Sequence, residues 1–168
     1  MRLGKQNFIN DGFGVAEKYL EIANADEISA RALKEKRLFN QAGYFFIQAM
    51  EKHIKYHIAK KINVTNSHFA DELRKTMGHS LDESLNLLFK VYAGNNDVLF
   101  NQLTDQIKTQ VFHEINFLAL HNKVRYPIYN TKFQNYSYLA LGARDCETLQ
   151  KMLTLLKKYL DELSRRVS

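Results

Sequence analysis

Hydrophobic side chains recur every three or four residues along most of the chain, which is the spacing of one face of an α-helix. The pattern predicts a short helix over about Val15–Ala23, a loop at 24–26 and a long helix over about Glu27–Ile62. Two apolar stripes lie side by side on the long helix, so we expect it to contact several neighbours. Its polar positions, including Lys52 and Lys55, are expected to face solvent.

The middle of the chain contains clear signals for helix starts and ends. Ser80 and Glu83 form a capping-box pattern, in which each side chain accepts a hydrogen bond from the main-chain amide of the other residue. The leucine-rich helix that follows is expected to end at Gly94. A further helix is predicted over about Val98–Asn122, because its apolar residues keep the helical spacing.

The last part of the chain combines an irregular segment with a very regular one. Between Lys123 and Gly142 the helical spacing fails, and this segment contains the only proline and four tyrosines. A connection of this length is either partly ordered or functional. The final helix has apolar residues at alternating steps of three and four, as in the seam of a helical bundle: Cys146, Leu149, Leu153, Leu156, Leu160 and Leu163.

These elements predict an all-α protein, an antiparallel up-and-down bundle of four to five helices with an extra N-terminal helix. One proline and 7 glycines leave few helix breakers, which argues against a β-sandwich or barrel. The 168 residues suit a single domain over residues 1–168 with a core at about 30–163. The segment 1–26 is either part of the bundle or an N-terminal appendage.

The composition indicates the cellular compartment and the chemical class of a binding partner. A single cysteine, Cys146, can form neither an internal disulfide nor a thiolate metal cluster, which fits a reducing compartment. We find no signal peptide and no apolar run long enough for a membrane span, so we expect a cytoplasmic protein without a membrane partner. The net charge of +6 favours an anionic partner, although it also suits a basic surface that binds none.

Two histidines on the long helix form the first candidate site. His53 and His57 lie one helical turn apart, as two zinc ligands would. Zinc proteases carry a glutamate directly after the first histidine, and here that position is Ile54. We therefore interpret the pair as lining a bundle face or a subunit contact, and we predict no metal and no cofactor.

A second candidate lies between two predicted helices. Arg74 and His79 could act on a phosphodiester, with the histidine as acid or base and the arginine stabilising the charge of the transition state. The alternative is a surface arginine and a histidine at a helix start. Phosphate-binding glycine loops, nucleophile elbows and paired carboxylates are missing from the sequence.

The tyrosine-rich segment is the most suggestive surface element. Aromatic rings close to cations can stack on bases while the cations contact phosphates. The alternative is a loop that is held over the bundle by its own aromatic side chains. The residues concerned are Lys123, Arg125, Tyr126, Tyr129, Lys132, Tyr136 and Tyr138.

The order of these features resembles the HEPN domain family. The run from Ala42 to Lys55 is similar to the first long helix of HEPN domains, and Gly78–Leu81 looks like the entry to their second core helix. Arg125-Tyr126-Pro127 resembles the Arg-Tyr-Pro that follows the third core helix in many members. With the leucine-rich final helix, the resemblance covers about residues 30–163.

The resemblance implies a helical bundle that pairs as a homodimer. Roles known in the family include metal-independent RNA cleavage, binding of RNA or nucleotides, and service beside a nucleotidyltransferase partner in bacterial toxin–antitoxin or defence systems. Ribonuclease members carry an arginine and, a few residues later, a histidine late in the chain. This sequence has no histidine after His121, so the expected catalytic base is missing.

We therefore expect a non-catalytic bundle that dimerises and binds a nucleotide or RNA. Its ligand would meet Lys52 and Lys55 on the long helix and Arg125 and Tyr126 in the irregular segment.

Two alternatives remain open. One is a metal-independent ribonuclease that uses Arg74 and His79. The other is a protein-interaction adaptor whose final helix and histidine face bind another chain.

Overall fold

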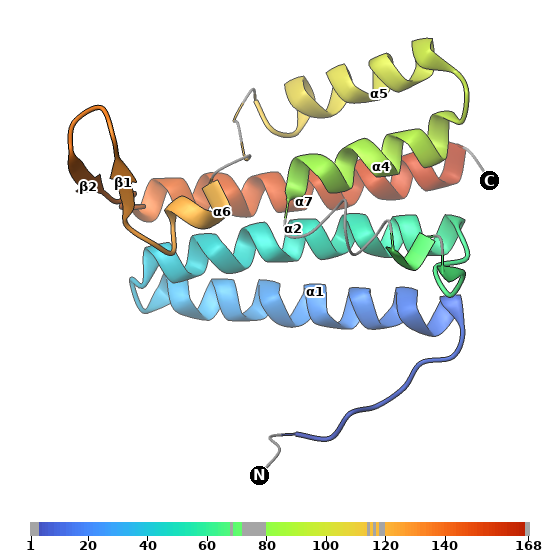
Figure 1. Ribbon diagram of the computed structural model, residues 1–168, viewed down its shortest axis with the longest axis horizontal. Helices are drawn as coiled ribbons and strands as arrows, with labels where there is room; N and C mark the ends of the chain where they lie inside the picture. Colours follow the sequence, from blue (N-terminus) through green and yellow to red (C-terminus); the bar gives the residue numbers. More distant parts are fainter. Residues whose placement is uncertain are drawn as a thin grey trace.

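The computed structural model describes residues 4–67, 69–71, 80–113, 115, 117 and 120–166. It shows an all-α bundle with one small hairpin, which confirms the predicted fold class (Figure 1). In chain order the elements are α1 (Gly12–Glu35), α2 (Phe39–Lys61), α4 (Leu81–Ala93), α5 (Asp97–Gln110), α6 (Leu120–Lys123), β1 (Ile128–Asn130), β2 (Asn135–Ser137) and α7 (Ala143–Arg166).

Helix α2 is the centre of the bundle and contacts α1, α4 and α7. Helix α1 runs antiparallel to α2, whereas α7 runs along α2 in the same direction, so that the starts of α2 and α7 lie at one end (Figure 1). Helix α5 turns back along the outside of α4. Within the described residues, no helix is both long and apolar enough to cross a membrane.

Apolar side chains from these helices form one continuous core. Helix α2 contributes fully buried residues on more than one side, including the adjacent Phe46 and Ile47 as well as Met50. Helix α1 meets α2 through a row of small side chains, which permit a close approach of the two backbones. This row consists of Ala16, Ala23 and Ala30, each with no exposed surface.

The first predicted helix boundary is wrong. Residues 24–26 lie inside α1, which continues to Glu35, and the chain breaks instead at 36–38. There Arg37 adopts a left-handed conformation with a φ of 61°. The amide of Leu38 donates to the carbonyl of Leu33, and the amide of Arg37 donates to that of Lys34. This is the Schellman ending of a helix, which usually has glycine at the left-handed position.

The ends of α4 and the seam of α7 lie where the sequence predicts, although among the described residues only the half of the capping box that Ser80 accepts is formed. The hydroxyl of Ser80 accepts a hydrogen bond from the amide of Glu83 at 3.3 Å, and α4 ends where Gly94 adopts a φ of 58°. All six apolar residues of the predicted α7 seam are buried: Cys146, Leu149, Leu153, Leu156, Leu160 and Leu163.

The predicted helix over Val98–Asn122 is wrong in its second half, because α5 ends at Gln110. The amides of Val111 and Phe112 both donate to the carbonyl of Ile107, and the chain then leaves the helical path. Phe112 packs against Phe117 with ring centres 5.0 Å apart, and both rings are buried. Burial of these two rings therefore accompanies the turn of the chain away from α5.

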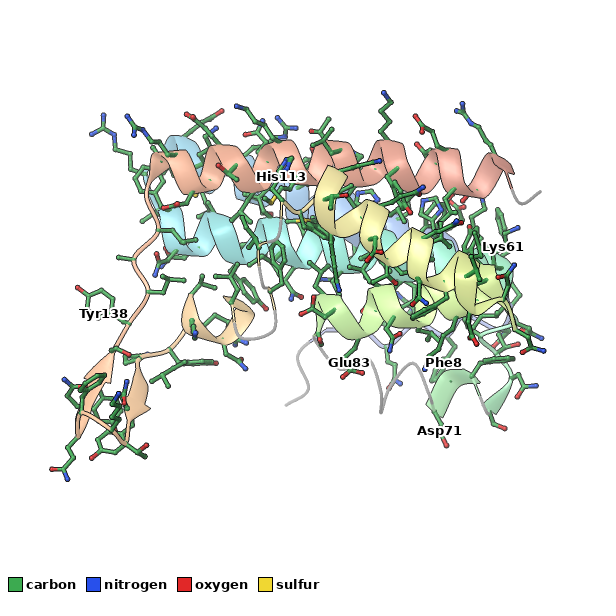
Figure 2. All side chains as sticks on the ribbon, turned by 90° about the horizontal axis from the view of Figure 1, so that it is seen from above. Phe8, Lys61, Asp71, Glu83, His113 and Tyr138 are labelled. Carbon is green, nitrogen blue, oxygen red and sulfur yellow. The ribbon has the colours of Figure 1, made fainter. Side chains whose placement is uncertain are left out.

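Strands β1 and β2 form an antiparallel hairpin in the segment that lacks helical spacing. In the register, Ile128 pairs with Ser137, Tyr129 with Tyr136 and Asn130 with Asn135. The hairpin extends beyond the end of the bundle where α2 and α7 begin, and both views show it apart from the helices (Figures 1 and 2).

Candidate functional site

Lys52 and Lys55 do not lie on a solvated face, so that part of the prediction is wrong. Lys55 is 8% exposed, and its Nζ lies 2.5 Å from a carboxylate oxygen of Glu51, which is 1% exposed. The Nζ of Lys52 lies 2.6 Å from Asp26 on α1 and donates to the amide oxygen of Gln48 at 2.9 Å. Because α2 has neighbours on several sides, the polar residues of its middle turns are enclosed as well as the apolar ones.

These side chains form a connected polar network inside the bundle. The amide of Gln48 also donates to Glu51 at 3.2 Å, so the network runs from Asp26 through Lys52 and Gln48 to Glu51 and Lys55. Buried charges are tolerated when each has a partner of opposite charge and further hydrogen bonds. The network explains the burial of these lysines without a ligand.

The other two predicted ligand contacts, Arg125 and Tyr126, lie beside the first turns of α2. The guanidinium carbon of Arg125 is 5.0 Å from the ring centre of Tyr44 and 4.7 Å from that of Tyr126. Arg125 also donates to the hydroxyl of Tyr126 at 2.7 Å. Both residues are exposed, so the cation and the ring remain open to a ligand.

The four predicted ligand contacts therefore fall in two places. On α2, Tyr44 is eight residues before Lys52, which corresponds to about 12 Å along the helix axis. Arg125 and Tyr126 share the Tyr44 end with the hairpin, whereas Lys52 and Lys55 belong to the internal network. Only Arg125 and Tyr126 belong to an exposed candidate surface. The predicted catalytic pair, Arg74 and His79, lies outside the described residues.

Asn40, which the sequence analysis did not single out, fixes the segment that carries the hairpin. Its amide nitrogen donates to the carbonyl of Leu139 at 2.7 Å and to that of Val124 at 3.3 Å. Its amide oxygen accepts from the main-chain nitrogen of Leu141 at 2.7 Å. One side chain on the first turn of α2 thus bonds to the main chain both before and after the hairpin.

Gly43, one turn further along α2, provides the second point of attachment. A Cβ atom at this position would collide with the side chain of Leu141 and approach that of Leu149. The absence of a side chain therefore lets the segment after the hairpin pack directly on the α2 backbone. A single glycine within a helical pattern gave no indication of which segment it contacts.

The hairpin carries exposed aromatic rings on and around its strands. Tyr129 and Tyr136 face each other across the strands with ring centres 5.2 Å apart, and they are 49% and 71% exposed. Phe133 in the turn and Tyr138 after β2 are 64% and 77% exposed. Figure 2 shows Tyr138 projecting away from the bundle. We call this set, with Tyr126, the aromatic hairpin.

Only positive formal charges lie in the sequence around the aromatic hairpin. From Ile115 to Arg144 the sequence contains no aspartate or glutamate, while it contains Lys123, Arg125 and Lys132. The Nζ of Lys132 lies 5.5 Å from the centre of the Phe133 ring. Exposed rings next to cations, without nearby carboxylates in the chain, suit a polyanion that also has flat apolar groups.

A hollow of about 420 Å³ lies at the base of the hairpin. Rings, a cation and small polar side chains line it, among them Lys123, Tyr126, Asn130, Ser137 and Tyr138. It differs from the groove of about 580 Å³ between α4 and α5, whose lining is mostly apolar with Asp82, Glu83 and Lys108 among its polar residues. The hollow is therefore the better match for a polar aromatic ligand.

The paired histidines face α7 in the interior. His57 Nδ1 lies 2.8 Å from the hydroxyl of Ser164, which also lies 2.9 Å from the hydroxyl of Tyr92. His53 is 4% exposed, and its Nε2 has no hydrogen-bond partner among the described residues. Burial lowers the pKa of His53 and that of His57 to about 4. Both side chains are therefore neutral at pH 7 and belong to the core.

Cys146 is also part of the core. Its side chain is fully buried, and its thiol donates to the carbonyl of Phe39 at 3.3 Å. Burial raises the pKa of this thiol above its usual value, and the carboxylate of Asp145 acts in the same direction. A buried, protonated thiol is a poor nucleophile.

Comparisons of the chain with protein-family models, with curated proteins and with solved structures find no match, so the HEPN resemblance stays a prediction.

Proposed function

We propose that this protein binds single-stranded RNA without cleaving it, and that the aromatic hairpin is the binding surface. The observation that carries this proposal is the combination of exposed rings and cations in a chain segment without carboxylates. Tyr129, Phe133, Tyr136 and Tyr138 are all at least 49% exposed on an element that stands apart from the bundle.

The physical basis is the composition of single-stranded RNA. Each unpaired base has an apolar face that stacks on an aromatic side chain, with a gain of about 1–3 kcal/mol per base. Each phosphate attracts cations such as Lys123 and Lys132. A double helix would expose few of its base faces, so the exposed rings favour a single strand.

Binding without cleavage agrees with the positions of those possible catalytic side chains that the structure describes. Cys146, His53 and His57 are each at most 4% exposed, so a phosphodiester on the hairpin would not reach them. Arg74 and His79 lie outside the described residues, and a ribonuclease that uses them is an alternative outcome of the test. Dimerisation, a nucleotidyltransferase partner and a role in toxin–antitoxin or defence systems remain predictions from the HEPN resemblance.

The test is an anisotropy titration of a labelled single-stranded RNA of about twelve nucleotides. Low salt and EDTA favour binding and exclude metal-dependent cleavage. We expect the double variant Tyr129→Ala/Tyr136→Ala to lose about tenfold or more in affinity, because two stacking faces are removed. The variant Phe13→Ala is the matched control, because Phe13 is 71% exposed in the first turn of α1, and α1 begins at the end of the bundle opposite the hairpin (Figure 1).

Three outcomes would contradict the proposal. If the control loses as much affinity as the hairpin variant, the hairpin is not the binding surface. If neither variant nor the original protein binds RNA, the protein is better explained as an interaction adaptor. If a denaturing gel shows shortened RNA, and His79→Ala abolishes the shortening, the ribonuclease alternative is correct.

A further inference from the structure

The two faces of the hairpin differ in chemistry. Residues opposite each other in an antiparallel pair share a face, and successive residues alternate between faces. Tyr129 and Tyr136 therefore present their rings on one face, and Asn130 belongs to the other. Asn130 and Ser137 line the hollow from this second face, and Tyr129 also contributes to its lining. One face is thus suited to stacking, and the other carries groups that form directional hydrogen bonds.

The turn of the hairpin fixes which atoms Asn130 offers to a ligand. Its Oδ1 accepts a hydrogen bond from the main-chain nitrogen of Lys132 at 3.1 Å. A main-chain N–H group can only donate, so the amide oxygen must face the turn. The NH₂ group then points away from the turn, and its two N–H donors bond to no other described residue. Asn130 therefore offers donors rather than acceptors.

We propose that the hollow holds one unpaired base and prefers a keto base to an amino base. The carbonyl oxygen of a keto base, such as O4 of uracil, would accept from the NH₂ group of Asn130. Cytosine has nearly the same shape but carries an amino group at that position, so two donors would face each other. The rings of Tyr126 and Tyr138 provide apolar walls for the base, and Lys123 provides a charge for its phosphate.

This inference rests on the proposed RNA binding, and it adds a preference among bases. Stacking on Tyr129 and Tyr136 alone would tolerate any base, because every base has an aromatic face. A preference between two pyrimidines of nearly the same size requires a directional contact. Comparing uracil with cytosine therefore distinguishes the directional contact of Asn130 from stacking alone.

The experiment compares oligouridine with oligocytidine of equal length, using the full chain. We expect the original protein to bind oligouridine about tenfold more tightly. The decisive variant is Asn130→Asp. Its carboxylate still accepts the amide of Lys132, so the turn is retained, but it offers acceptors in place of the two donors. We expect the preference to move toward cytidine, whose amino group can donate to a carboxylate.

The control is Asn135→Asp, which introduces the same charge at the position paired with Asn130. Asn135 does not line the hollow. We expect this variant to weaken binding to both oligonucleotides by the same factor and to keep the preference for uridine. The unfolding temperature of both variants is measured, so that a loss of the fold is recognised.

The outcomes separate this inference from the proposed function. If the original protein binds both oligonucleotides equally well, the base preference is refuted while RNA binding stands. If Asn130→Asp folds and keeps the full preference for uridine, the assignment to Asn130 is refuted. If the protein binds neither oligonucleotide, the proposed function itself fails and the inference fails with it.

Discussion

Lys52 bridges two helices, because its ammonium group contacts Asp26 on α1 and Gln48 on α2. Its side chain is only 20% exposed, so removing the charge leaves a carboxylate and an amide without their partner in a poorly solvated place. We expect Lys52→Ala to lower the free energy of unfolding by about 1–3 kcal/mol. The measurement is urea denaturation.

The exposed Lys151 on α7 provides the control for this change. Lys151→Ala should alter the free energy of unfolding by about 0.5 kcal/mol or less. Equal effects at Lys52 and Lys151 would mean that the contact with Asp26 contributes nothing measurable to stability.

His53 and His57 should make stability depend on pH. Desolvation lowers the pKa of each side chain to about 4. The positive charge of Lys157 lowers the pKa of His53 further, and that of Lys60 lowers the pKa of His57. The carboxylate of Asp161 opposes both shifts. In the unfolded chain both pKa values return to about 6.5. Between these values the unfolded state binds more protons, so stability falls as the pH is lowered from about 6.5 toward 4. Above that window the two histidines contribute no pH dependence.

Denaturation in urea at pH 7 and at pH 5 measures this effect. We expect a lower free energy of unfolding at pH 5, with a smaller difference in the variant His53→Leu, which removes one of the two titrating groups. Equal stability of the original protein at the two pH values would show that the histidines are not buried in their neutral form.

Among the elements, the hairpin depends on the polar attachment that Asn40 provides. Asn40 bonds main-chain groups of Val124, Leu139 and Leu141, which lie on both sides of the hairpin. We expect Asn40→Ala to leave the helical content nearly unchanged but to speed hydrogen exchange in residues 124–141. Unchanged exchange in that segment would show that Asn40 does not hold it. The exposed Asn122 supplies a control substitution in the preceding helix α6.

The elements that the sequence predicted well are those whose burial is one-sided or whose ends carry a recognisable signal. In α7 the apolar residues lie on one face and contact the bundle, so their spacing alone revealed the helix. In α4 the start at Ser80 and the end at Gly94 follow from the chemistry of those two residues. Such local signals do not depend on the rest of the fold.

The elements that the sequence misplaced depend on tertiary contacts. The helical spacing places Lys55 away from the apolar stripes and so predicts exposure, but α2 is covered on several sides and Glu51 provides a buried partner. The end of α1 lacks glycine, since Arg37 takes the left-handed position. Nearly all strand residues of the hairpin are exposed, without alternation between apolar and polar residues, so its strands show no period of two.

At the scale of the whole molecule, the bundle and the hairpin have separate roles. The helices bury His53, His57, Cys146 and the charged pair Glu51 and Lys55, whereas the hairpin leaves its aromatic rings exposed beyond one end of the bundle (Figure 1). Nearly every residue from Ile128 to Ser137 is exposed. The bundle thus contains the core of the protein, and the proposed recognition of RNA belongs to the hairpin.

The most direct test replaces residues 128–137 by a glycine–serine linker of the same length and measures binding of single-stranded RNA. Because the replaced side chains contribute little to the core, we expect an unchanged unfolding temperature and a loss of nearly all RNA affinity. If the replaced protein is folded and binds RNA as tightly as the original, the aromatic hairpin is not the binding surface and the central claim is wrong.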